Sequence, residues 1–242
     1  MNLQFVTSIS QSYWNSVAKY CIGTWNLPGE LIVYIDQPDG DIEWFSEIEH
    51  KKRLVHVPSL KFEHSLKEDE DTELDGNSGT KTKVRKFWGK TCAQLHAVRN
   101  RPHDTRIVWL DADMEQQVPH ISETLFDFQY HHCVSIMKSG DWVDDRWETG
   151  LVIFNQEHPK LDLFMNQYEK YWKDKEKLSK LWRPYDAQVL GKIAEMRGYH
   201  NLVTKPCENK DALEHTRFRH YFKHWINKDN KKLLQKKIVD EN

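Results

Sequence analysis

Two carboxylates directly follow the most apolar run of the chain. The run at 105–110 (TRIVWL) is typical of a buried strand, and Asp111 and Asp113 come immediately after it. Burying two carboxylates is costly unless a cation compensates them, and open α/β sheets bind ligands beyond the carboxyl ends of their strands. Oxygen ligands of this kind suit Mg²⁺ or Mn²⁺. We therefore expect Asp111 and Asp113 to hold a divalent metal that neutralises a diphosphate leaving group.

The D-x-D spacing occurs twice more, in contexts that favour a bland interpretation. Asp39 and Asp41 lie in a Pro-Asp-Gly turn, where aspartate is favoured by local hydrogen bonding to the backbone. Asp69 and Asp71 lie in an acidic stretch without apolar neighbours. Only the third pair follows a predicted buried strand, so we expect the site there.

The rest of the sequence predicts the elements that position these carboxylates. Short apolar runs alternate with segments of helical periodicity, which predicts one α/β domain over 1–242, with a mostly parallel central sheet flanked by helices. Strands are expected at 3–9, 31–35, 54–57, 105–110, 133–137, 151–154 and 202–205. Helices are expected between the first two strands, at 84–98 and 121–130, after Pro159 and Pro184, and in the basic C-terminal segment 206–242.

Residues 67–82 change from acidic to Gly/Ser-rich to basic and offer no apolar face. Loops longer than about 12–15 residues are usually functional or disordered. We predict a mobile loop here, placed just before a basic helix.

Composition excludes several classes of protein. The net charge is -2 and aromatic residues make up 12%, which argues against disorder and against a strongly basic nucleic-acid-binding domain. No apolar run approaches the ~20 residues of a membrane span, and no signal peptide is visible. The 4 cysteines are scattered, which favours reduced thiols over a disulfide framework or a zinc ribbon. We therefore expect a soluble cytoplasmic protein with no nucleic-acid partner and no membrane span.

Five different motifs follow one another along nearly the whole chain. They are VTS at 6–8, KVRKFWGK at 83–90, WLDAD at 109–113, ETGLVIFNQEHP at 148–159 and YDAQVL at 185–190. Taken together, this pattern resembles that of GT-A glycosyltransferases, in particular the small single-domain enzymes of viruses and bacteria. The resemblance implies a GT-A fold, a UDP-sugar donor such as UDP-glucose, a carbohydrate acceptor, and Mn²⁺ or Mg²⁺ on the D-x-D. A viral member of this group would act in the host cytoplasm.

Carried onto this sequence, the resemblance gives roles to the donor-side residues. Asp111 is expected to contact ribose or metal-bound water, and Asp113 to ligate the metal directly. Thr7 and Ser8 are expected beside the nucleobase and ribose. The basic residues of the 83–90 motif are expected near the phosphates or the donor sugar, with a solvated helix face as the alternative; they are Lys83, Arg85 and Lys90.

Two further carboxylates are candidates for the chemistry on the sugars. Glu148 begins an apolar strand, where it could accept hydrogen bonds from sugar hydroxyls or act as a base toward the acceptor. Asp186 follows Pro184 in the first turn of a helix, where the helix dipole alone would favour it. The resemblance implies that Asp186 faces the donor sugar.

A C-terminal histidine often completes the metal site in such enzymes, but their usual H-x-x-G-x-x-K ending is not present here. His215, His220 and His224 are all candidates. We favour His220 as the metal ligand, because Arg219 and Lys223 flank it and could meet a diphosphate.

Two alternatives to a glycosyltransferase stay open. A sugar nucleotidyltransferase also uses carboxylates at strand ends, although it normally has a Gly-rich basic N-terminal loop, and a non-catalytic carbohydrate- or partner-binding domain could have kept the fold. The aromatic segment with Trp142 and Trp147 could stack on an acceptor sugar or belong to the core. The sequence does not name the donor sugar, the acceptor, the stereochemical outcome or the oligomeric state.

Overall fold

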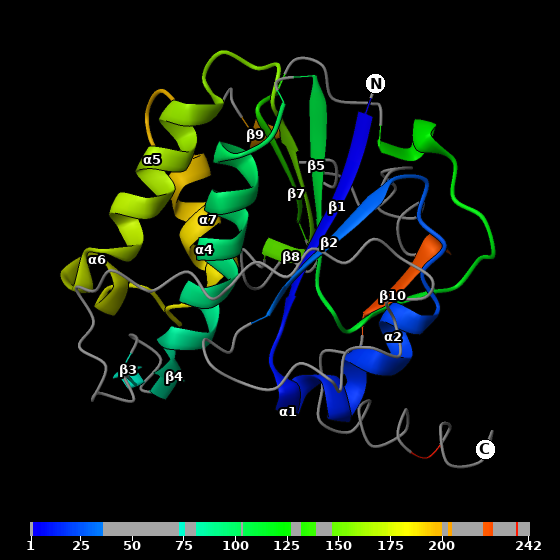
Figure 1. The fold of residues 1–242 in the computed structure, drawn as a ribbon. Helices are drawn as coiled ribbons and strands as arrows, with labels where there is room; N and C mark the ends of the chain where they lie inside the picture. Colours follow the sequence, from blue (N-terminus) through cyan, green and yellow to red (C-terminus); the bar gives the residue numbers. More distant parts are fainter. Residues whose placement is uncertain are drawn as a thin grey trace.

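A central six-stranded sheet organises the chain (Figure 1). The computed structural model describes residues 2–35, 73–75, 81–102, 104–126, 132–138, 147–199, 203–204, 220–224 and 236. The strand order is β2-β1-β5-β8-β7-β9. These strands are β1 Asn2–Ile9, β2 Glu30–Ile35, β5 Thr105–Leu110, β7 Val134–Lys138, β8 Trp147–Asn155 and β9 Val203–Thr204.

Five of the six strands run in the same direction. β1 is parallel to both β2 and β5, and β7 is parallel to β9, whereas β8 is antiparallel to its neighbours β5 and β7. The prediction of a mostly parallel sheet is therefore confirmed. Because β8 is reversed, it begins at the edge where β5 ends, and Leu110 pairs with Leu151 there. Residues that follow β5 and residues that open β8 consequently share one edge of the sheet.

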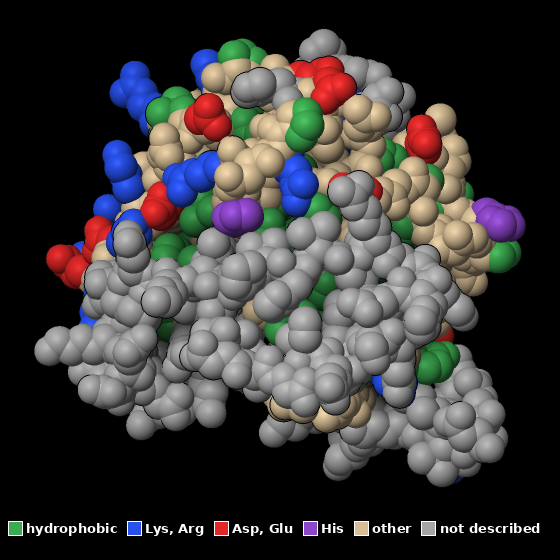
Figure 2. Space-filling view, in the orientation of Figure 1, with side chains coloured by type: hydrophobic (Ala, Val, Ile, Leu, Met, Phe, Trp, Pro, Cys, Tyr) green, Lys and Arg blue, Asp and Glu red, His purple; other side chains and the backbone are tan. Residues whose placement is uncertain are grey.

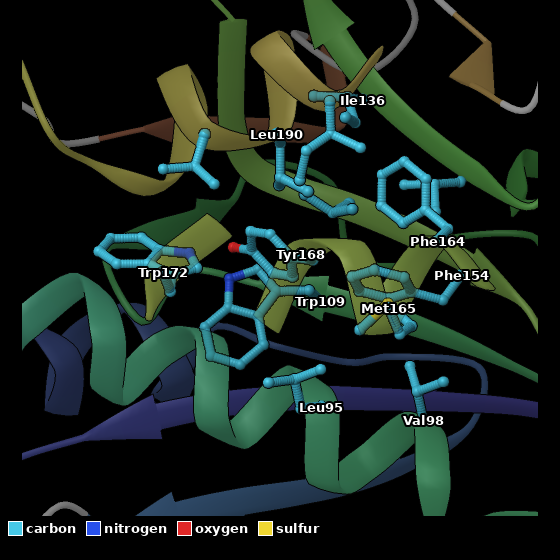
Figure 3. Packing of buried hydrophobic residues seen from close by; sticks show 14 of the residues in the cluster. Leu95, Val98, Trp109, Ile136, Phe154, Phe164, Met165, Tyr168, Trp172 and Leu190 are labelled. Atoms are coloured by element: carbon cyan, nitrogen blue, oxygen red, sulfur yellow. The ribbon is translucent and has the colours of Figure 1, made fainter. Parts of the chain in front are cut away.

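In the described part of the chain, four helices cover one face of the sheet, on the left of Figure 1. They are α4 Val84–Arg99, α5 Leu161–Trp172, α6 Lys175–Ser179 and α7 Asp186–Glu195. Figure 3 shows the apolar layer between helices and strands, in which Leu95 of α4, Tyr168 and Trp172 of α5 and Leu190 of α7 surround Trp109 of β5. This packing confirms the helices predicted from 84 and after Pro159 and Pro184.

The exposed surfaces of α5 and α6 carry charges of both signs, on the left of Figure 2. Glu169 pairs with Lys173, Asp174 with Lys177, and Glu176 with Lys180. Such exposed pairs contribute little to stability. They nevertheless show that this surface is mixed in sign rather than basic.

The opposite face of the sheet is covered by the N-terminal helical segment. It comprises α1 Gln11–Tyr13, a π-helical turn Trp14–Ala18 and α2 Lys19–Gly23. Trp14 and Ile22 pack there with Phe5 of β1, whose ring makes an edge contact with Phe126 at 5.1 Å between centroids. Alternate residues of β1 and β5 thus face the two apolar layers, as the two-residue period of a strand requires.

Some elements differ from the sequence prediction. Within 67–82, β3 Glu73–Asp75 and β4 Lys81–Lys83 form an antiparallel pair, so its described residues are not structureless. The register sets Glu73 opposite Lys83 and Asp75 opposite Lys81.

Other predicted elements are shorter or fall outside the description. The helix expected at 121–130 is a 3₁₀ turn, Glu123–Phe126, as far as the described residues extend. In the C-terminal segment, the described residues include a strand, β10 Phe222–His224, where we expected helix. The strand expected at 54–57 lies outside the described residues.

One glycine is required by close backbone contact. A Cβ at Gly29, just before β2, would stand 2.4 Å from the carbonyl oxygen of Leu3 in β1. β2 can therefore begin beside β1 only with glycine at this position. In the part of the chain that the structure describes, no helix has the length and apolar character needed to span a membrane.

Candidate active site

The candidate site lies where β5 ends and β8 begins, and Lys90 of α4 is at its centre. Lys90 Nζ stands 2.7 Å from Asp111 Oδ1 and 2.7 Å from Asp186 Oδ2. The same ammonium donates to the carbonyl oxygen of Thr149 at 2.9 Å. One cation therefore joins the carboxylate after β5 to the carboxylate that opens α7.

Burial makes these contacts strong. Lys90 is 9% exposed and Asp186 is 3% exposed, and the Lys90 ammonium lies 5.4 Å from the centroid of the Trp109 ring. Burial lowers the pKa of Lys90, but Asp111 and Asp186 more than offset it, so that the pKa is raised above its ordinary value. Lys90 consequently keeps its charge at any physiological pH.

Asp186 is placed by the start of α7. It is the acidic residue in the first turn of that helix, where the helix dipole favours a negative charge. Thr149 Oγ1 donates to Asp186 Oδ2 at 2.5 Å, so β8 as well as α4 fixes this carboxylate. The buried phenol of Tyr168 senses this carboxylate. Its burial and, second, the negative charge of Asp186 raise the pKa of Tyr168. Asp186 is thus held rigidly at the inner end of the site.

The strand-end motif is held by β5 and β8. Trp109 Nε1 donates to Asp111 Oδ1 at 2.7 Å, and the Asp111 amide donates to the carbonyl oxygen of Gly150 at 2.7 Å. The Met114 amide donates to the carbonyl oxygen of Asp111 at 2.9 Å, which closes a tight turn. The Asp111 side chain is 24% exposed, so it can reach a ligand while Lys90 holds it.

Asp113 faces the N-terminal helical segment. It is 6% exposed, and the Tyr13 hydroxyl donates to Asp113 Oδ2 at 2.5 Å. Burial, and then the nearby charge of Asp113, raise the pKa of Tyr13 well above its ordinary value. The phenol therefore stays protonated and acts as a donor.

The C-terminal segment returns to this site through strand pairing. β6 Met114–Gln116 follows the D-x-D motif directly and pairs antiparallel with β10. His224 stands opposite Met114 in the register, and Lys223 stands opposite Glu115. The Gln117 amide extends the pairing by donating to the carbonyl oxygen of Tyr221 at 2.8 Å. The backbone of His224 is therefore next to the residue that follows Asp113.

The role of His220 as a metal ligand stays a prediction. His220 is exposed, and its ring makes an edge contact with Tyr221 at 5.3 Å between centroids. His224 stands opposite Met114, and Phe222 stands opposite Gln116, so the partners of β10 lie farther from Asp113 in the sequence toward its N-terminal end. His220 precedes that end by two residues. Among the described residues, no three metal-ligating side chains gather at one point.

Other predicted donor-side residues are placed less directly. Thr7 in β1 is wholly buried, whereas Ser8 is half-buried near the carboxyl end of that strand. Lys223 is exposed on β10. For three residues the structure describes the backbone alone: Lys83 ends β4, Arg85 lies in the first turn of α4, and Glu148 is the second residue of β8. The backbone of Glu148 lies at the same edge as Asp111. Trp147 opens β8, where the structure describes its backbone alone, and Trp142 and His215 lie outside the described residues.

The sequence analysis missed Thr149, Trp109 and Tyr13. Thr149 is the middle residue of the E-x-G motif, so its hydroxyl could have been noticed there. Trp109 reads as a core residue because a strand of apolar residues surrounds it. Tyr13 likewise reads as part of the apolar face of a helix, and nothing local indicates a partner 100 residues away.

The donor set fits a divalent cation. Lys90 pairs with Asp111 and Asp186, whereas Asp113 accepts from Tyr13. These three carboxylates and one ammonium together carry an excess of two negative charges. One divalent cation would neutralise that excess, and carboxylate oxygens are the ligands that Mg²⁺ and Mn²⁺ take. Asp111 and Asp113 are the two of these that lie at the strand end.

The fold is that of the GT-A glycosyltransferases. No protein-family description and no curated protein matches the sequence, but solved structures do. The galactosyltransferase LgtC, solved with donor and acceptor sugar analogs, aligns with a TM-score of 0.55 and 12% identity over 93% of this chain and 87% of LgtC. A glycosyltransferase involved in glycosylation of the major capsid of PBCV-1 aligns with a TM-score of 0.50 and 12% identity over 96% of this chain and 99% of that enzyme.

A longer protein of similar structure supports the same fold assignment. The glycosyltransferase GlyE of Streptococcus pneumoniae TIGR4 aligns with a TM-score of 0.54 and 13% identity, and covers 84% of this chain. The chain spans only 45% of GlyE, so it corresponds to less than half of that protein. The expected GT-A fold, with its mixed sheet between two helical layers, is confirmed.

Proposed function

We propose that this protein is a metal-dependent glycosyltransferase that moves a sugar from a UDP-sugar, such as UDP-glucose, to a carbohydrate or other hydroxyl acceptor. The observation that carries the proposal is the joining of Asp111 and Asp186 by Lys90, at 2.7 Å to each, in a GT-A fold. The carboxylate after β5 and the carboxylate at α7 are thereby held together. The diphosphate of a bound donor would then lie near Asp111, and its sugar would lie near Asp186.

The proposed metal ligands are Asp111, Asp113 and a histidine of the C-terminal segment. The pairing of β10 with β6 favours His224 over His220 for this role, because His224 stands opposite the residue after Asp113. Bound Mn²⁺ or Mg²⁺ would supply electrophilic stabilisation of the UDP leaving group. Lys223 and Arg85, from β10 and α4, are proposed to approach the phosphates.

The proposed chemistry on the sugar is divided between two carboxylates. Asp186 is paired with Lys90 and bonded to Thr149, so it is proposed to orient the donor sugar by accepting hydrogen bonds from its hydroxyls. Glu148, at the opening of β8, is proposed to act toward the acceptor hydroxyl as a base. Ser8 and the backbone at Thr7 are proposed to border the nucleobase and ribose.

The test is release of UDP from a panel of UDP-sugars, with Mn²⁺ and with EDTA. We expect metal-dependent hydrolysis of one or a few donors, and Asp186→Asn is expected to lower kcat by about 10²-fold or more while UDP affinity stays near wild type. Asp162→Asn is the matched control, because Asp162 also lies in the first turn of a helix but is exposed.

A second variant separates metal binding from chemistry. Asp113→Asn is expected to abolish the Mn²⁺-dependent part of UDP binding, measured by titration calorimetry, because it removes a proposed ligand charge. If wild-type protein neither binds UDP with Mn²⁺ nor releases UDP from any donor, the proposal is wrong.

A further inference from the structure

Tyr13, which forms a hydrogen bond with Asp113, lies outside all five sequence motifs. The Tyr13 hydroxyl donates to Asp113 Oδ2 at 2.5 Å, and it joins the helical segment after β1 to the turn after β5. The two residues are 100 positions apart in the sequence. This contact places a neutral donor directly on a proposed metal ligand.

Local structure fixes the position of Tyr13. β1 ends at Ile9, and Ser10 caps the following helix by accepting from the Tyr13 amide, at 3.3 Å to its hydroxyl and 3.0 Å to its carbonyl oxygen. The Tyr13 ring packs against Val17 and Cys21. A side chain held by a cap and by packing can orient its partner precisely.

We propose that Tyr13 is a positioning residue for the metal site, whose hydroxyl fixes the Asp113 carboxylate for binding of a divalent cation. The proposal rests on the proposed function, since it requires a metal at Asp113. A carboxylate has two oxygens with about four lone-pair sites, so Oδ2 can accept from Tyr13 while the group also ligates a cation. Hydrogen bonds to ligating carboxylates commonly tune metal affinity.

The same helical segment offers a matched control in Tyr20. Its hydroxyl donates to Glu115 Oε1 at 3.0 Å, so it too joins this segment to a carboxylate just after β5. Glu115 is two residues beyond Asp113 and is not a proposed ligand. Deleting either phenol oxygen removes one hydroxyl–carboxylate bond between the same two segments. Of these two hydrogen bonds, the one from Tyr13 is made to the proposed metal ligand.

The experiment measures Mn²⁺ affinity directly, by titration calorimetry with Mn²⁺ alone and with Mn²⁺ plus UDP. Wild type, Tyr13→Phe, Tyr20→Phe and Asp113→Asn are compared, and thermal unfolding without metal verifies that each variant is folded. We expect Tyr13→Phe to raise the Kd for Mn²⁺ about 10- to 100-fold, as is typical when a hydrogen-bond partner of a ligand is lost. Tyr20→Phe is expected to stay within about twofold of wild type.

Each other outcome has a distinct meaning. Unchanged Mn²⁺ affinity in Tyr13→Phe, with binding lost in Asp113→Asn, overturns the role of Tyr13 and leaves the proposed function standing. Equal weakening in Tyr13→Phe and Tyr20→Phe also overturns it, because the effect would then come from loosening the helical segment. If wild type does not bind Mn²⁺ with or without UDP, the metal site fails and this role of Tyr13 fails with it.

Discussion

At the scale of single residues, Lys90 gives the site its arrangement. Lys90 is 9% exposed and its ammonium lies between Asp111 and Asp186, so the alternative of a solvated helix face is wrong for this lysine. Its approach to a phosphate or a sugar stays a prediction. A buried ion pair is a weak source of net stability, but removing one partner leaves the others uncompensated. Asp111 and Asp186 therefore need the positive charge of Lys90 whichever ligand the site binds.

Replacing Lys90 tests this requirement. Lys90→Met removes the ammonium and leaves two neighbouring carboxylates without their shared cation, so we expect the free energy of unfolding to fall by about 3 kcal/mol. Urea unfolding followed by circular dichroism measures the loss. A variant as stable as wild type would show that Asp111 and Asp186 do not depend on Lys90.

Two controls accompany this variant. Lys192→Met removes an exposed lysine that pairs with Glu195 at 3.0 Å, and should change stability by less than about 0.5 kcal/mol. In the double variant Lys90→Met/Asp186→Asn, part of the loss should be recovered, because one of the uncompensated charges is gone. Additive losses in that double variant would contradict the coupling.

At the scale of elements, the pairing of β6 with β10 brings residues 222–224 beside the segment that follows Asp113. β6 is itself fixed by the residues that follow α2, since Trp25 Nε1 donates to the carbonyl oxygen of Met114 at 2.5 Å. Phe222 of β10 is buried in the same apolar layer as Trp25. The described residues of the C-terminal segment are thus held beside Asp113 by a strand of their own.

This register predicts which histidine affects metal binding. His224→Ala is expected to lower Mn²⁺ affinity by about 10-fold or more, because loss of a ligand costs at least as much as loss of a ligand's partner. His220→Ala, four residues earlier on the exposed side of the segment, is expected to leave the affinity unchanged. Titration calorimetry of both variants decides between them. If His220→Ala weakens Mn²⁺ binding and His224→Ala does not, His220 is the ligand, and the inference from the register of β10 is wrong.

At the scale of the whole molecule, α4 connects the site to the far edge of the sheet. Lys90 lies in this helix at the site, and two turns later His96 meets Tyr34 of β2, with 3.0 Å between His96 Nδ1 and the Tyr34 hydroxyl. Burial, and then the charge of Arg101, lower the pKa of His96. The same buried interface raises the pKa of Tyr34 to about 12.

The lowered pKa of His96 makes stability depend on pH. In the unfolded chain His96 takes up a proton near pH 6.5, while the folded protein resists it, so its contribution is present above about pH 6.5 and is lost as the pH falls through the lower, folded-state value. His96→Gln should therefore lose less unfolding free energy than wild type between pH 7.5 and 5.5. Denaturant unfolding at both pH values measures this, with exposed His120→Gln as control. Parallel losses in wild type and His96→Gln would contradict it.

The sequence by itself determined the alternation of strands and helices, the strand that ends in Asp111 and Asp113, and the resemblance to a GT-A fold. Most of these features are local: a two-residue or 3.6-residue period, a glycine or proline at an element's end, and each single motif involve residues close together in the sequence. Asp186 could likewise be singled out, because it stands in the first turn of a recognisable helix.

Only the tertiary structure decided what these residues contact. Lys90, Asp111 and Asp186 come from a helix, a strand end and another helix, and no spacing in the sequence shows that one ammonium would join the other two. Tyr13 reads as an apolar-face residue until the helical segment is packed beside β5. The choice of His224 depends on the register of β10 against β6. Such contacts are set by how whole elements pack and pair, and a period along one segment carries no information about the side chain that will face it.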